Sequence, residues 1–167
     1  MIKINVMKNK IQSIERNKLI EKIYKYFPEN FILLHEKELF ALNSSRSEVN
    51  FYYKKTWKEA LKKKENIYGS DLSFLTPKAI SYYLPAFMIY CIEDPDNADE
   101  LLDRLLSFLL NLCNDLELYL WTEKRRQTFL KYLSSDQKDI VELYIEYMFQ
   151  EYPEDFLFIL QLRSIGK

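Results

Sequence analysis

The sequence predicts an all-α fold, a single compact domain of six or seven helices packed around a buried, Pro-kinked central helix at about residues 77–92. A length of 167 residues is typical of one domain. The composition is 48% hydrophobic and 16% aromatic, unlike that of a disordered chain. Glycine occurs only at Gly69 and Gly166, whereas β-rich and nucleotide-binding folds use many glycines in turns and phosphate loops. We therefore expect one helical domain over residues 1–167, with residues 1–9 as a loosely ordered tail.

The central helix is predicted because residues 77–92 are apolar on almost every side. A helix without a polar face must be surrounded by other elements. Thr76 supplies an N-cap, and Pro77 occupies the first helical position, where its missing N–H costs nothing. Pro85 lies inside the helix, removes one helical hydrogen bond and predicts the kink.

The flanking helices follow from apolar residues at helical spacing and from capping residues. Thr56 with Glu59, and Ser134 with Gln137, fit the capping box. Residues 29–50 fit either a helix or a short buried strand, followed by a loop. The remaining helices are expected at about residues 10–27, from Thr56 to before Gly69, and at about 98–113, 123–133, 135–152 and 156–165.

Few catalytic motifs are available to this chain. His35 is the only histidine, which excludes paired-histidine zinc sites, and we expect it to be structural or on the surface. No GxGxxG, GxxxxGK[ST] or CxxC motif occurs. Cys91 and Cys113 lie in apolar helical sequence, as buried reduced thiols of a cytosolic protein do. We expect no cofactor, no metal ion and no catalytic residue.

The charge balance is nearly neutral, at −1 overall, so no global field attracts nucleic acid or an anionic membrane. The most apolar stretch, residues 74–92, contains polar residues and two prolines, which favours a core helix over a membrane span. The N-terminus lacks the apolar region of a signal peptide, so we expect a cytoplasmic protein. Two basic runs, within residues 54–64 and at residues 124–126, are interpreted as solvated helix faces, and nucleic acid is not an expected partner.

The densest group of carboxylates lies between the central helix and the next one. Acidic residues at a helix N-terminus complement the helix dipole, which explains part of the run. A partner-binding surface is the second interpretation, and metal binding or acid–base catalysis is the third. A calcium loop does not fit, because Asp99 stands where the loop requires glycine. The members of the run are Glu93, Asp94, Asp96, Asp99, Glu100 and Asp103.

One segment, DLSFLTPKAISYYLPAFMIYCIEDPD, resembles the centre of a family of small uncharacterised bacterial proteins, a domain of unknown function. The resemblance covers about residues 15–152, and its distinctive phrase has the form LSFL(S/T)P….YYLPA. The phrase contains no nucleophile, base or metal-ligand set, which indicates a packing motif. The Lys-rich stretch at residues 62–66 and the tail after Pro153 depart from the family pattern. The residues that carry the motif here include Trp57 upstream and Phe74, Thr76, Pro77, Tyr82, Tyr83, Leu84 and Pro85.

The resemblance implies a binding role, because related families occur among bacterial toxin–immunity systems. Together with the small size, the aromatic richness and the acidic run, it leads us to expect an immunity protein that binds a cognate toxin such as a nuclease. Two alternatives stay open. One is an enzyme that uses carboxylate and tyrosine groups in a cleft near Pro85, and the other is a structural or adaptor protein that forms a homodimer.

Overall fold

The structure is a computed structural model that describes residues 15–29, 36–40, 51–110 and 123–153. Its central element is α6 (Pro77–Glu93), which begins where the sequence predicted. The Thr76 hydroxyl accepts a hydrogen bond from the Ala79 N–H at 3.1 Å, and Pro77 stands in the first turn. The helix continues through Pro85 to its end at Glu93. Its buried residues include a continuous run from Tyr83 to Ile92, so α6 is enclosed by the other helices as expected.

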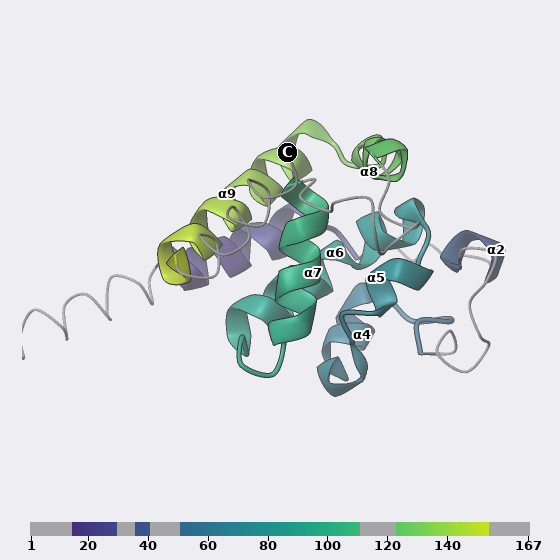
Figure 1. The fold of residues 1–167 in the computed structure, drawn as a ribbon, viewed down its shortest axis with the longest axis horizontal. Helices are drawn as coiled ribbons and strands as arrows, with labels where there is room; N and C mark the ends of the chain where they lie inside the picture. The colour runs from purple at the N-terminus through teal and green to yellow at the C-terminus, as the bar shows by residue number, and fades with distance from the viewer. Residues whose placement is uncertain (1–14, 30–35, 41–50, 111–122, 154–167) are drawn as a thin grey trace, which may run out of the picture.

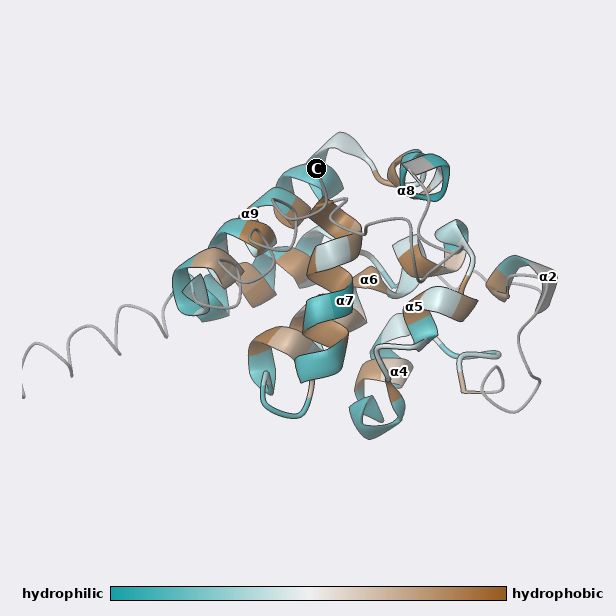
Figure 2. Cartoon of the chain, viewed as in Figure 1, coloured by the Kyte–Doolittle hydropathy of each residue, from teal (hydrophilic) through white to brown (hydrophobic). Residues whose placement is uncertain are grey.

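Seven further elements have their bounds within the described residues, and α6 contacts α2, α4, α7 and α8 (Figure 1). Figure 2 shows apolar residues on the inner faces of α7 and α9 and polar residues on their outer faces. Residues 15–26 form another helical segment beside α9. The bounds are α2 (Glu36–Leu39), α4 (Trp57–Leu61), the 3-10 helix η1 (Lys64–Asn66), α5 (Asp71–Phe74), α7 (Asp99–Leu110), α8 (Glu123–Leu130) and α9 (Ser135–Glu151).

The all-α class is therefore confirmed, and both capping boxes form. Thr56 and Glu59 cap α4 reciprocally, as Ser134 and Gln137 cap α9. The helix predicted from Thr56 to before Gly69 is shorter than expected, because α4 ends at Leu61 and the 3-10 helix η1 follows it. The short helix α5 was not predicted, because four residues are too few for a helical period to be visible.

The segment that fitted either a helix or a strand contains the short helix α2. Among the described residues, its only extended pairing is the isolated antiparallel bridge between Phe40 and Leu75. The expectations for residues 1–9, His35, Cys113 and the helix at 156–165 lie outside the described residues.

Three tyrosines are buried in the core, and burial is the main cause that raises the pKa of each hydroxyl. Tyr52, Tyr83 and Tyr144 are at most 2% exposed, and their pKa values all lie well above the usual 10.0. Burial likewise raises the pKa of the Cys91 thiol to about 12. Burial lowers the pKa of the Arg125 guanidinium to about 10, a shift with the opposite effect on alkaline stability.

The protein should consequently lose stability in alkali. Above about pH 9 the unfolded chain releases the Cys91 proton, and above about pH 10 it releases tyrosine protons, all of which the folded chain retains. Stability is therefore complete below about pH 9 and falls as the pH rises. Each buried hydroxyl or thiol with a raised pKa lowers the free energy of unfolding by about 1.4 kcal/mol per pH unit in this range. The lowered pKa of Arg125 has the opposite effect and offsets only one of these groups. Urea titrations should give a constant midpoint from neutral pH to about pH 8.5, and a marked drop at about pH 11. An equal midpoint at both ends would contradict the burial of these hydroxyls.

Candidate functional site

The family-type motif surrounds a buried carboxylate at the start of α5. Asp71 is 7% exposed, and its Oδ2 accepts hydrogen bonds from the Tyr52 hydroxyl at 2.5 Å and the Tyr68 N–H at 2.9 Å. The ring of Tyr52 packs against Tyr83, with centroids 4.7 Å apart. The hydroxyl of Tyr83 donates to the carbonyls of Tyr52 and Lys55, each at 2.8 Å. These bonds join α5, α6 and the turn at residues 51–54.

A basic side chain completes the same region from α8. The guanidinium of Arg125 donates to the carbonyl of Leu72, at 2.9 Å, and to that of Leu75. These carbonyls lie in α5 and at its end, where helical partners are missing. The prediction that residues 124–126 form a solvated face is therefore wrong for Arg125 and Arg126, which are partly buried, and Arg126 donates to the Leu109 carbonyl at 3.1 Å. Lys124 is exposed, as expected. The sequence pattern missed this role because it carries no sign of a partner 50 residues away.

Thr76, in the middle of the motif, connects α6 to α2. The Thr76 hydroxyl donates to the Glu38 carbonyl, and the Thr76 N–H donates to the Leu39 carbonyl at 2.9 Å. The structure places Trp57, Tyr83, Leu84 and Pro85 in the core and leaves Phe74, Thr76, Pro77 and Tyr82 partly exposed. Asp71, Tyr52 and Arg125 are the structural residues that sequence reasoning missed. The motif region is thus a hydrogen-bonded junction of helices.

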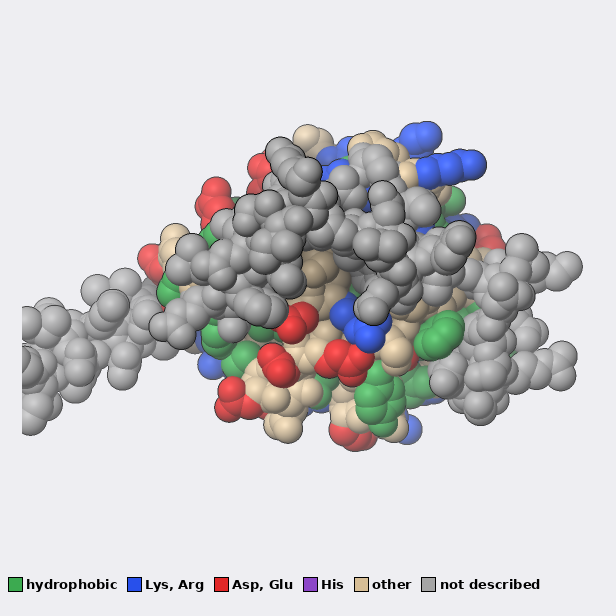
Figure 3. Space-filling model, viewed as in Figure 1, with side chains coloured by type: hydrophobic (Ala, Val, Ile, Leu, Met, Phe, Trp, Pro, Cys, Tyr) green, Lys and Arg blue, Asp and Glu red, His purple; other side chains and the backbone are tan. Residues whose placement is uncertain are grey.

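The six carboxylates predicted as a partner-binding group lie together at the junction of α6 and α7, and we call them the acidic patch. Five of them, Glu93, Asp96, Asp99, Glu100 and Asp103, are exposed, while Asp94 is partly buried. Figure 3 shows Asp and Glu side chains gathered over the lower part of α7. Among the described residues, no group of three or more His, Cys, Asp or Glu side chains is arranged to hold a metal ion.

Asp94 holds the turn between the two helices. Its N–H donates to the Tyr90 carbonyl, which ends α6, and its carbonyl accepts from the Ala98 N–H. The Asn97 side chain, at 2.8 Å, is the main cause that lowers the pKa of the Asp94 carboxyl, and Lys64, at 3.2 Å, adds to the effect. Asp99 and Glu100 occupy the first turn of α7, where carboxylates complement the helix dipole. The helix-dipole interpretation of the acidic run therefore fits these two residues.

A hollow of about 410 Å³ opens beside the patch. Its lining includes Tyr68, which is 56% exposed. Gly69 brings this loop against α7, since a Cβ there would lie 2.8 Å from the Glu100 carbonyl oxygen. The Lys64 ammonium lies in the same region, 5.3 Å from the Tyr90 ring centroid. The remaining lining residues are Glu65, Ile67, Asp94 and Asn97.

The basic run at residues 54–64 has several internal partners. Lys58 pairs with Glu29 at 3.1 Å, Lys64 pairs with Asp94, and Lys55 donates to the Phe51 carbonyl. Lys54, Lys62 and Lys63 are exposed. The solvated-face interpretation is therefore right for part of the run and incomplete for the rest.

Comparison with known proteins gives one match. Residues 36–158 match the family of unknown function DUF6714. The chain belongs to this family. The match spans α2 to α9, so it includes the motif junction and the acidic patch. No curated protein and no solved structure matches the chain.

Two further observations bear on the chemistry of this DUF6714 member. Cys91 is fully buried, and a thiol whose pKa is about 12 is almost entirely protonated and unreactive at neutral pH. Pro85, near which an enzymatic cleft was one expectation, is buried between Leu84 and Ala86, both 0% exposed.

Within the described ranges, no helix has the length and apolar character that crossing a membrane requires.

Proposed function

We propose that this DUF6714 protein is a protein-binding module, an immunity protein that neutralises a cognate bacterial toxin by direct binding. The observation that carries the proposal is the acidic patch, five of whose six carboxylates are exposed beside the exposed ring of Tyr68. Tyrosine is enriched at the centres of protein interfaces, and surrounding charges determine which partner approaches. A basic protein surface is the complementary partner.

The proposed toxin is a nuclease, because nucleases bind an anionic substrate with a basic face. A carboxylate-rich surface would accelerate the encounter with that face and cover it. The carboxylates at Asp96 and Asp99 are exposed at the helix junction, so they can approach such a partner without rearrangement of the core.

The chemistry of the core supports binding over the enzymatic alternative. General acid–base catalysis needs groups whose pKa values lie near the working pH. The buried Tyr52, Tyr83 and Tyr144 hydroxyls have pKa values raised far from that range. Asp71 is engaged by Tyr52 and by the Tyr68 N–H, an arrangement that joins segments of the fold.

The test begins with capture of partners by the tagged full-length protein from cells that express it, with washes at low and high salt. Partners are identified by mass spectrometry, purified and assayed for nuclease or other toxic activity. We expect one stoichiometric partner, released by high salt, whose activity disappears when an equimolar amount of the protein is added. A partner whose activity is unaffected by the protein would refute the immunity function.

A further inference from the structure

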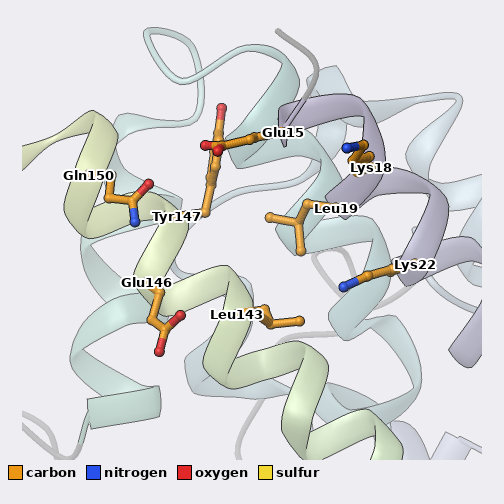
Figure 4. A pocket seen from close by; sticks show the side chains of 8 residues that line it. All are labelled: Glu15, Lys18, Leu19, Lys22, Leu143, Glu146, Tyr147 and Gln150. Carbon is orange, nitrogen blue, oxygen red and sulfur yellow. The ribbon is translucent and has the colours of Figure 1, made fainter. Parts of the chain in front are cut away.

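A second surface lies on the side formed by residues 15–26 and α9. A groove of about 250 Å³ runs between these two helices (Figure 4). On each helix the lining residues follow the spacing i, i+3, i+4, i+7, so each contributes one continuous stripe. The stripes are Glu15, Lys18, Leu19 and Lys22 on one helix and Leu143, Glu146, Tyr147 and Gln150 on the other.

The two helices are antiparallel along this groove. The Gln137 side chain donates to the Tyr26 carbonyl at 3.1 Å, which joins the start of α9 to the end of the other helix. At the opposite end, Glu15 lies near Tyr147 and contributes to raising its pKa, although burial is the main cause. Figure 4 shows Leu143 facing the Lys22 end of the groove.

The groove has an apolar floor and charged walls. Leu143 is 37% exposed, a large fraction for a leucine that lies between two packed helices. Lys18 and Lys22 stand on one wall together with Glu15, and Glu146 stands on the other, so the first wall is net positive and the second net negative. None of the ion pairs among the described residues joins the two walls.

The two helices also carry opposite charge. Residues 15–26 contain four basic and two acidic side chains, whereas α9 contains five acidic side chains and one lysine. A second copy of the chain, related by a two-fold axis parallel to the groove, would place each basic helix over the acidic α9 of the other copy. Because the axis preserves the antiparallel register, Lys18 and Lys22 of one copy would flank Glu146 of the other. Every such pair would occur twice in an isologous contact.

We propose that this groove is a self-association surface, through which two copies of the chain pack their residue 15–26 helices and α9 helices face to face into a four-helix bundle. The charge complementarity of the walls favours a second copy as the occupant. Leu143, 37% exposed, supplies the apolar contact, since it would meet the Leu143 of the other copy, while Leu19 is buried beneath it in its own core. The inference concerns a surface other than the acidic patch and does not depend on the immunity function.

The test is sedimentation of the purified full-length protein from low micromolar to millimolar concentration, which should show a reversible monomer–dimer equilibrium. Reversal of Glu146 to Lys should weaken dimerisation by about tenfold, because repulsion replaces attraction at two symmetry-related positions. The double variant Lys22→Glu, Glu146→Lys should return the dissociation constant to within about threefold of the original, because it restores opposite charges.

Glu21→Lys is the matched control, since it makes the same charge change on an exposed residue that does not line the groove. It should leave the dimer unaffected. A protein that stays monomeric at every concentration overturns the proposal. So does a dimer that responds equally to Glu146→Lys and Glu21→Lys, or one that the double variant fails to restore. Circular dichroism of each variant establishes that the helices remain folded.

Discussion

Replacement of Asp71 by alanine is expected to destabilise the protein by about 2–4 kcal/mol, because it leaves buried donors without an acceptor. The Tyr52 hydroxyl is 2.5 Å from the carboxylate and lies in a residue that is only 2% exposed, so water does not readily replace the lost bond. The Tyr68 N–H loses its acceptor as well. Urea unfolding followed by circular dichroism measures the loss.

Two companion variants show whether the lost acceptor is the cause. Asp71→Asn retains an acceptor oxygen and should cost clearly less than Asp71→Ala. Tyr52→Phe removes a donor and should cost about 1 kcal/mol. Combined with Asp71→Ala, it should add less than its own effect, because the two residues share one bond. Full additivity of the two changes would contradict the proposed bond.

Replacement of Arg125 by methionine should also destabilise the fold, by about 1.5–3 kcal/mol. It removes the donors to the carbonyls of Leu72 and Leu75, which lie in a largely enclosed region. Part of the loss is offset, because the fold no longer has to bury a charge, a cost seen in the lowered pKa of Arg125. The free energy of unfolding in urea measures the net effect.

The control for this change is Arg125→Lys. Lysine keeps the charge but does not place its ammonium where the guanidinium Nη2, the donor to both carbonyls, lies, so the stability of this variant should fall between those of the wild type and Arg125→Met. Lys124→Met, at the exposed neighbouring position, should change stability by less than about 0.5 kcal/mol. Equal effects at positions 124 and 125 would mean that the Arg125 contacts contribute nothing.

The parts of the fold that could be predicted from sequence are those with a local signal. The apolar character of α6, its Thr76 cap and the capping boxes at Thr56 and Ser134 each lie within a few adjacent residues, and all were confirmed. The hydrogen bonds of Asp71 and Arg125 join residues 19 and 53 positions apart. Such contacts depend on how the helices pack against one another, and residue spacing in the sequence does not predict that packing.

The candidate site shows the same division. The acidic patch is contiguous in sequence, so its residues could be named in advance. The hollow beside it depends on a loop that meets α7 through Gly69. One signal for this contact was available, since Gly69 is the single glycine within the helical part of a chain that otherwise avoids glycine, and an isolated glycine can mark a close backbone approach. The groove between residues 15–26 and α9 had no such signal.

The central proposal is that the acidic patch binds and neutralises a toxin. Its most direct test is the amount of protein needed to inhibit the captured toxin, measured at low and high salt. The test compares the wild type with the patch variant Asp96→Lys, Asp99→Lys, Asp103→Lys. A control variant, Glu21→Lys, Asp139→Lys, Glu142→Lys, makes the same net charge change at exposed positions outside the patch.

We expect the patch variant to need at least about tenfold more protein at low salt and to lose most of the salt dependence, because local complementarity is removed. The control should change inhibition by less, since only the overall charge differs. Equal inhibition by the wild type and the patch variant, at both salt concentrations, would contradict the proposal that the acidic patch is the binding surface.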